Sequence, residues 1–507
     1  MTDEDRSGDL GYERLGEAKL SLVDVVAQSV GFMGPVFSAA FLIPLIVGFN
    51  AAAKGAGVAA PLSVLIAAIG IFAIGWIVAK YAKKIHAAGS LYDYVSAGLG
   101  KTIGAAAGWL YYSGTMVLTA GLGVLVAGYV HDSIFTADPA VPGVLSMESP
   151  LPIWAWGVVF ALAVFAVLYF GVQISTRVQL TLALVSAAVV LAFFVKVIAD
   201  LGSANDIAKT FTPSSSPDGW SGIFFGVLYG VLIFVGFETA ANLAEETAEP
   251  TRAIPRAVLL SVVVVSVFYL VAAYTQVAGF GFDLAVITDP AVAAAPLFAL
   301  GSPEAVGGFG SDNILKVLIV VVLLDILAVG VGAATASTRG VFAMARDRRL
   351  PGPLASVSRS HGTPVGAITL MVAVMVGFVA LNELWDDLFA LPDLPHYFSI
   401  FAWASTFGGF SLVVVYLLMS VGAFIGLRDH PNMAAVVVAS LVGIVLTLAA
   451  IFGAFYKVPS PTVLAPWFAL VWLAIGLVVT SLMRGRAPAS EVLGDLRSNG
   501  SVDVRRV

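Results

Sequence analysis

Residues Gly226–Arg256 read GVLYGVLIFVGFETAANLAEETAEPTRAIPR, and this stretch decides the expected fold. Its first half is apolar enough to lie inside a lipid bilayer, yet it carries a carboxylate, Glu238, directly after Gly236-Phe237. A charge at the centre of a bilayer costs at least ~2.5 kcal/mol, so a carboxylate there needs a partner or a function. The neighbouring glycine predicts a helix that is broken at mid-membrane, where freed backbone groups can hold a solute.

The composition of the chain is typical of a helical membrane protein. Of its 507 residues, 59% are hydrophobic and only 11% are charged, and the mean hydropathy is +0.96. A water-soluble protein of this size needs a more highly charged surface. The absence of cysteine excludes disulfides and thiolate chemistry, and the five scattered histidines have no metal-ligand spacing. We therefore predict an all-α polytopic membrane protein that has no cofactor, no metal and no nucleic-acid partner.

Twelve stretches reach the length of about 20 apolar residues that crosses a bilayer. They are Val23–Gly48, Val58–Ala79, Thr102–Val130, Ile153–Phe170, Val178–Ala199, Ser221–Ala244, Ala257–Gly279, Leu315–Met344, Val365–Leu381, Ser399–Ile425, Met433–Phe455 and Val463–Met483.

Basic residues are divided unequally between the two ends of these spans. Of the 26 Lys and Arg, 21 fall on the side of the amino terminus, and the other five are Lys54, Lys196, Lys209, Lys316 and Lys457. Basic loops are retained in the cytoplasm. We therefore expect a multi-pass protein of the cytoplasmic membrane with both termini in the cytoplasm.

The first span carries an interruption at a place comparable to that in the sixth. Its middle reads SVGFMGP over Ser29–Pro35, and proline removes an amide donor while glycine permits conformations that other residues avoid. These two spans lie five helices apart, and an odd separation gives two halves of opposite topology. The pattern predicts a substrate site at the two breaks, although glycine and proline also serve close packing of membrane helices.

Several segments resemble the amino acid–polyamine–organocation transporters. The sixth-helix signature of that family is similar to residues 234–238, 242–246 and 250–256. Its connection between helices eight and nine is similar to residues 339–351 and 362–364. The stretch that enters its third helix is similar to residues 88–94 and 108–109. The resemblance covers residues 20–430, and the first helix matches more loosely.

The resemblance implies twelve helices in a leucine-transporter-like fold, which is a five-plus-five inverted repeat followed by two further helices. It also implies secondary transport of an amino acid or related amine by alternating access. The expected units are a cytoplasmic tail at 1–20, a first repeat at 21–200, a second repeat at 218–425, two added helices at 430–484 and a second cytoplasmic tail at 485–507.

In the pattern of that family, the substrate binds to the backbone of the two breaks. The positions are Gly31, Gly34, Pro35 and Val36 for a substrate carboxylate, with Phe234, Val235 and Gly236 for its amino group and Phe237 as a wall of the pocket. The first break of the family commonly reads Gly-Ser-Gly or Gly-Thr-Gly. Here proline and valine follow the second glycine, so one amide is lost, which leaves room for a substrate without a carboxylate.

Two carboxylates are expected inside the membrane. Glu238 can carry a coupling proton, or it can hydrogen-bond the unwound backbone and stay fixed. Asp325, in LLDILAVGVGAATAST, can neutralise a cationic substrate, carry a proton or be a structural ion. The expected coupling ion is therefore H⁺ or Na⁺.

A sodium ion would be expected between helices one and eight, where Thr335 and Ser337 offer hydroxyl oxygens. Small hydroxyl residues also allow helices to pack closely, so this alternative stays open. Some proton-coupled relatives replace the sodium ion by a lysine on helix five. The corresponding position here is Ser186.

Charged residues at the cytoplasmic ends of helices one, six and eight are predicted to close an inner gate, with anchoring at lipid headgroups as the alternative. They are Asp24, Glu245, Glu246, Arg252 and Arg339, with Arg256 and Arg346 on the same side. Clustered catalytic side chains and a filter repeat are absent from the sequence, which argues against a membrane enzyme and a channel. An exchanger and a non-transporting nutrient sensor on the same fold remain alternatives.

Overall fold

The structure is a computed structural model that describes residues 19–48, 55–136, 143–287, 295–391, 395–456 and 460–482, together with 289, 292 and 458. Residues 1–18 and 483–507, which include nearly all of both predicted tails, lie outside the described residues. Within the described part, every regular element is a helix, and β-bridges join only single residues such as Leu20 and Thr247.

Eleven helical segments of the described chain are long and apolar enough to cross a membrane. A twelfth, α8 (Ile153–Tyr169), has 17 residues. At a rise of 1.5 Å per residue such a helix is about 25 Å long, which lies at the lower end of the usual range for a spanning helix. These twelve segments correspond in order to the twelve predicted spans.

The twelve segments have the following bounds. They are α2 (Leu22–Met33) with α3 (Pro35–Phe37), the π-helix η1 (Ser38–Leu42) and α4 (Ile43–Val47); α5 (Ala60–Ala82); α7 (Lys101–Tyr129); α8; α9 (Val172–Leu201); α11 (Gly219–Leu232) with the 3₁₀-helix η6 (Phe237–Glu246); α12 (Pro250–Ala278); α16 (Asp312–Arg346); α17 (Val365–Leu384); α18 (His396–Gly426); α19 (Met433–Phe455); and α20 (Leu464–Leu482).

Shorter helices lie between these segments. They are η2 (Gly57–Ala59), α6 (Leu91–Leu99), η3 (Val130–Ile134), η4 (Gly202–Ala204), α10 (Ile207–Thr210), η5 (Pro213–Ser215), α13 (Leu284–Ile287), α15 (Pro296–Gly301), η7 (Glu304–Val306) and η8 (Gly352–Ala355). The sequence analysis predicted no helix at α6, because a window of 20 apolar residues cannot detect a nine-residue amphipathic helix. Similarly, α12 begins earlier than predicted, because its first turns carry the charged residues Arg252 and Arg256.

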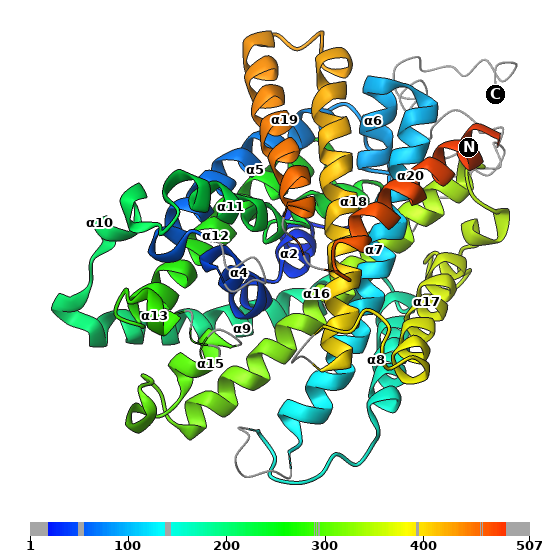
Figure 1. The fold of residues 1–507 in the computed structure, drawn as a ribbon. Coiled ribbons are helices and arrows are strands. Elements are labelled where there is room, and N and C mark those ends of the chain that lie inside the picture. The colour runs from blue at the N-terminus through cyan, green and yellow to red at the C-terminus, as the bar shows by residue number, and fades with distance from the viewer. Residues whose placement is uncertain are drawn as a thin grey trace, which may run out of the picture.

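The first broken span lies at the centre of the fold. Its α2 segment packs against α9, α12, α16 and η6, so this segment is enclosed by other helices and contacts the η6 part of the second broken span. Figure 1 shows α2 in the middle of the molecule and α7 running beside α18, the pair that forms one wall of this core. The last two helices lie outside it, with α19 against α5 and α18, and α20 against α7 and α18.

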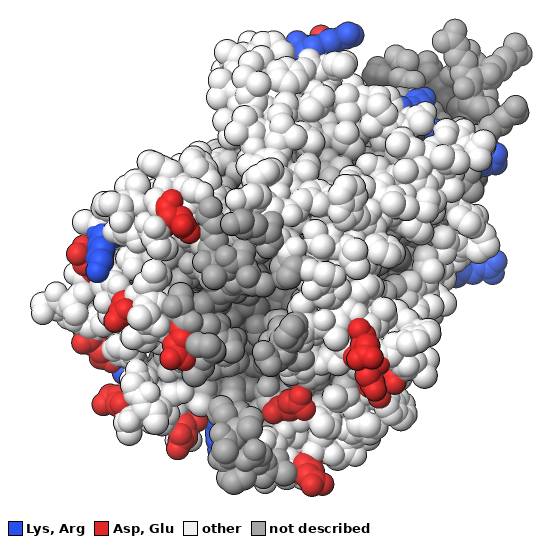
Figure 2. Space-filling view, viewed as in Figure 1, with Lys and Arg blue, Asp and Glu red and all other residues white. Residues whose placement is uncertain are grey.

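Acidic and basic side chains gather at opposite ends of the helices. We call the end where α2 begins and α16 finishes the basic face, and the opposite end the acidic face. Figure 2 shows Asp and Glu gathered over the lower part of the molecule, while most of the visible Lys and Arg lie along its upper and right-hand edges. This separation agrees with the division of charges expected from the sequence.

The topology can be tested without altering a native thiol, because the chain has no cysteine. Val306, which is 74% exposed between α12 and α16, lies on the acidic face, and Arg428, directly after α18, lies on the basic face. We expect an impermeant maleimide to label Val306→Cys in intact cells and to label Arg428→Cys only after permeabilisation. Labelling of both from outside would contradict a twelve-span topology.

Candidate functional site

The first break is centred on Gly34, where the backbone adopts a φ of +55° between α2 and α3. A side chain here would be strained, and a Cβ atom would overlap Cγ2 of Val329. The next residue, Pro35, begins the following helical segment and has no amide hydrogen to donate. Close packing and backbone conformation together therefore require glycine at this break.

The second break separates α11 from η6. Helix α11 finishes at Leu232, and Gly236 has a φ of +115° immediately before the 3₁₀-helix begins. A Cβ atom on Gly236 would lie 2.9 Å from Cγ of Phe32 and 3.1 Å from the backbone nitrogen of Met33. The two interruptions are therefore in direct contact with each other.

Side chains from neighbouring segments satisfy the backbone groups that the breaks set free. The hydroxyl of Tyr269, on α12, lies 3.0 Å from the carbonyl oxygen of Met33 and 2.6 Å from that of Ile233. Ser29 donates to the carbonyl oxygen of Phe237 (2.8 Å) and accepts from the amide of Ala240 (3.2 Å). Sequence reasoning missed Tyr269, because nothing distinguishes it from other aromatic residues of an apolar helix.

Glu238 is fully buried, and both of its oxygens accept hydrogen bonds. Tyr111 donates to Oε1 (2.6 Å), Tyr416 donates to Oε2 (2.7 Å), and the amide of Gly236 lies 3.2 Å from Oε2. The carboxylate thus holds the unwound backbone to α7 and α18. Of the two roles expected for Glu238, this geometry favours a fixed structural one. Tyr416 carried no signal in the sequence.

Asp325 is also fully buried, but only one of its oxygens is engaged. Its Oδ2 accepts the amide of Phe37 at 2.7 Å, so α16 contacts the segment that follows the first break. Its Oδ1 has no hydrogen-bond partner among the described residues. The structure therefore places Asp325 at the first break and Glu238 at the second.

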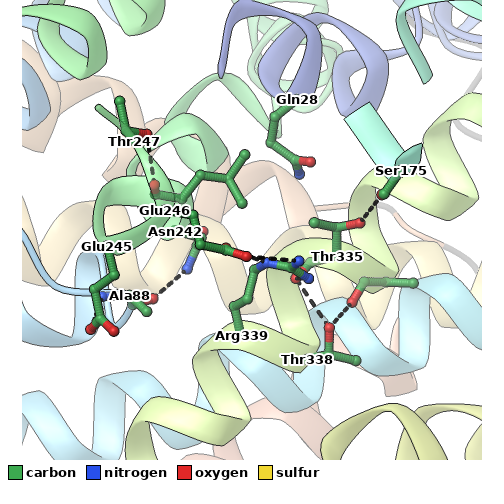
Figure 3. Close-up of polar contacts among 12 residues, drawn as sticks. Gln28, Ala88, Ser175, Asn242, Glu245, Glu246, Thr247, Thr335, Thr338 and Arg339 are labelled. Atoms are coloured by element: carbon green, nitrogen blue, oxygen red, sulfur yellow. Dashed lines mark hydrogen bonds and ion pairs between the residues drawn. The ribbon is translucent and has the colours of Figure 1, made fainter. Parts of the chain in front are cut away.

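The hydroxyls that were candidates for a cation site are engaged in contacts between protein groups. The Thr335 hydroxyl lies 2.8 Å from that of Ser175, as Figure 3 shows, and Ser337 donates to the carbonyl oxygen of Ala334 (3.1 Å). Two glutamine side chains lie beside them. Gln179 donates to Oε1 of Gln28 (3.2 Å), and Gln28 donates to the carbonyl oxygen of Gly332 (2.9 Å).

Two helix-five residues reach this junction, Ser175 and Gln179. Ser186, the position that the family resemblance matches to the lysine, lies further along the helix, where its hydroxyl donates to the carbonyl oxygen of Leu182 on its own helix. A count of residues along one helix cannot decide which of its turns faces α2 and α16, because that depends on how the helices pack.

Two ion pairs join η6 to α16 at the basic face. Arg339 contacts Glu246 at 2.9 Å, with side chains that are 0% and 4% exposed, and Figure 3 shows the guanidinium directed at this carboxylate. Arg346 contacts Glu245 at 2.6 Å, and Glu245 also accepts the amide of Ala88 (2.9 Å). These contacts tie the ends of two spanning segments to the connection between α5 and α6.

Two residues predicted for this gate lie elsewhere. Asp24 caps α2, where its carboxylate accepts from the amide (2.9 Å) and hydroxyl (2.7 Å) of Ser21. Arg252 lies 3.6 Å from Glu249 in a pair whose side chains are 67% and 68% exposed. Both residues occupy the predicted face, but a position near a helix end in sequence does not fix the direction of a side chain.

Breaking the Arg339–Glu246 pair should loosen this face. The substitution Arg339→Ala leaves a buried charge without its partner, which costs about 3–5 kcal/mol, whereas replacing both residues by methionine should restore most of the stability. We expect Arg339→Ala to lower the thermal midpoint. We also expect a Thr338→Cys reporter to be labelled from the basic face about tenfold faster or more, because a loss of ~1.4 kcal/mol in the stability of the closed state corresponds to a factor of ten.

The matched control is Arg252→Ala, because exposed ion pairs contribute about 0–1 kcal/mol. Equal labelling rates in Arg339→Ala and Arg252→Ala would contradict a gate at the buried pair.

Comparisons with known proteins agree with this geometry. The branched-chain amino acid permease BcaP of Bacillus subtilis is 24% identical over 454 residues, which cover 86% of this chain and 87% of that protein. A point mutant of the manganese transporter of Eremococcus coleocola matches with a TM-score of 0.54 over 96% of this chain and 99% of that chain, at 13% identity, which shows a shared fold. The amino acid permease family model matches residues 30–484. The chain therefore belongs to the amino acid permease family.

Proposed function

We propose that the protein is a secondary active transporter that moves an amino acid or a related amine across the cytoplasmic membrane by alternating access. The observation that carries this proposal is the direct contact between two helix breaks in the middle of the fold, at Gly34 and Gly236. Membrane helices are interrupted in this way where they line a site for a solute. The predicted substrate contacts from Gly31 to Val36 and from Phe234 to Phe237 all lie in these two segments.

The two breaks are equivalent parts of an inverted repeat. Residues 21–200 form the first half and residues 218–425 the second, with the two peripheral helices in 430–484 outside the moving core. Supporting this division, α2 and η6 each contact α12 and α16. Substrate would bind between the halves as one rocks against the other.

The basic face is the cytoplasmic face, as the excess of lysine and arginine supports. The buried pairs Arg339–Glu246 and Arg346–Glu245 then close the cytoplasmic side in this conformation. Toward the opposite side, the ring of Phe37 lies 5.6 Å from that of Phe41 and 5.8 Å from that of Phe401. These aromatic contacts lie where an outer gate would separate the breaks from the exterior.

Protons rather than sodium ions drive uptake in this proposal. A sodium ion requires several oxygen ligands, whereas the junction near Thr335 contains the side-chain NH₂ groups of Gln28 and Gln179, which are donors. Each of these NH₂ groups donates to an oxygen of the junction, which a cation would otherwise coordinate.

Uptake into proteoliposomes tests the function and the coupling ion together. We expect accumulation of amino acids or amines under an inward proton gradient, no change when choline replaces sodium at fixed pH, and loss of accumulation with a protonophore. A strict sodium requirement would contradict proton coupling. Binding without uptake would favour the nutrient sensor, and uptake only into preloaded vesicles would favour the exchanger.

Glu238→Gln tests the brace at the second break. A glutamine amide has one acceptor oxygen for the donors that now converge on the carboxylate, so at least one buried hydroxyl or amide loses its partner, at about 1–3 kcal/mol. We expect a lower thermal midpoint and slower uptake. The exposed Glu304→Gln is the matched control. If Glu238→Gln matched it in both measurements, the carboxylate would not hold the break.

A further inference from the structure

We infer that Asp325 makes this transporter select amines that lack a carboxylate, because its side chain already occupies a backbone amide directly after the break at which a substrate carboxylate would bind. The inference rests on the transport function proposed above and specifies its substrate class. It follows from three observations: the amides at the first break are engaged, a buried carboxyl group lies beside them, and one acceptor oxygen remains open.

The amides that follow the first break are not free to hold a substrate. The amide of Gly34 donates to the carbonyl oxygen of Val30 (3.2 Å), and Pro35 has no amide hydrogen. The amide of Phe37 donates to Asp325 at 2.7 Å, and the amide of Val36 is directed at the same carboxylate. A residue of the protein thus already supplies the anion that this segment can bind.

A second carboxylate at this point would be repelled. A Cβ atom on Gly34 would lie 3.3 Å from Oδ2 of Asp325, so this buried carboxyl group is in contact with the break itself. An ionised Asp325 and a second carboxylate a few ångströms apart in a medium of low dielectric repel strongly, and removing the carboxylate of an amino acid from water adds a desolvation penalty. The free carboxylate of an amino acid is therefore disfavoured here.

The same carboxylate is suited to receive an ammonium group. Its Oδ1 has no hydrogen-bond partner, and none of the ion pairs among the described residues involves Asp325. An ammonium group offers hydrogen-bond donors and a compensating charge. Glu238 provides the contrast, because both of its oxygens are already hydrogen-bonded. Of these two buried carboxylates, Asp325 is therefore the one that can take a cationic ligand.

An inorganic cation fits the surroundings of Asp325 less well. The described residues contain no group of three or more His, Cys, Asp or Glu that could hold a metal ion. Divalent cations usually take six or more oxygen ligands or a set of several protein side chains. A single carboxylate with one open oxygen is instead matched to an organic ammonium group.

A matched pair of ligands tests the inference on the unmodified protein. Leucine and 3-methylbutylamine carry the same branched side chain, and only leucine has a carboxylate. We expect the amine to raise the thermal midpoint of purified protein, to bind at least about tenfold more tightly than leucine, and to be the better substrate in proteoliposomes. Tighter binding of leucine would overturn the inference and would leave the transport function standing.

The variant Asp325→Asn tests the residue itself. Asparagine keeps an oxygen that can accept the amide of Phe37 but removes the charge, so we expect amine affinity to fall at least about tenfold and the preference over leucine to disappear. Asp312→Asn, an exposed carboxylate at the start of the same helix, is the matched control. Unchanged amine affinity in folded Asp325→Asn would overturn the inference.

Two further outcomes distinguish an amine ligand from an inorganic cation, and failure of the inference from failure of the proposed function. Stabilisation by sodium or manganese chloride alone, lost in Asp325→Asn and without any response to the amine, would overturn the inference in favour of an inorganic cation. If proteoliposomes took up neither ligand, nor any other amino acid or amine in a screen, the proposed function would fail together with the inference. If Asp325→Asn does not fold, the comparison of the two ligands on the unmodified protein still decides.

Discussion

The structure depends on satisfying the backbone groups that two helix breaks expose inside a membrane. An unpaired amide or carbonyl in the hydrocarbon region costs several kcal/mol, so an interruption persists only where side chains or a ligand pair with it. Here Tyr269 reaches carbonyl oxygens of both breaks, and Glu238 and Asp325 each accept a backbone amide. The enclosed position of α2 follows from this need, because lipid offers no such partners.

The two buried carboxylates show how similar residues acquire different roles. Glu238 is held by two tyrosine hydroxyls and a backbone amide, so its contacts are complete in the protein alone. In Asp325, Oδ2 accepts a backbone hydrogen bond, whereas Oδ1 has no hydrogen-bond partner among the described residues. A saturated carboxylate is suited to bracing a break, whereas a half-satisfied one is suited to binding. At the basic face, the ion pairs of Glu245 and Glu246 join the same η6 segment to α16, so one continuous segment connects the second break to these ion pairs.

The sequence predicted the features that depend on local composition. The twelve spans follow from hydropathy, and the breaks at Gly34 and Gly236 follow from glycine and proline in otherwise apolar helices. The sequence could not supply contacts that depend on packing. Tyr416 lies 178 residues from Glu238 along the chain, and no pattern marks the pair. Gln179 was missed for the same reason, because helical periodicity gives the faces of a helix without their neighbours.

The measurement that tests this account most directly is a cryo-electron microscopy map of the purified protein in lipid nanodiscs. The account predicts that the main chain is interrupted at Gly34 and between Ile233 and Gly236, with the Tyr269 hydroxyl between the two interruptions. It also predicts that an added ligand gives density in contact with these two interruptions. Two continuous helices through these positions, or ligand density remote from both, would contradict it.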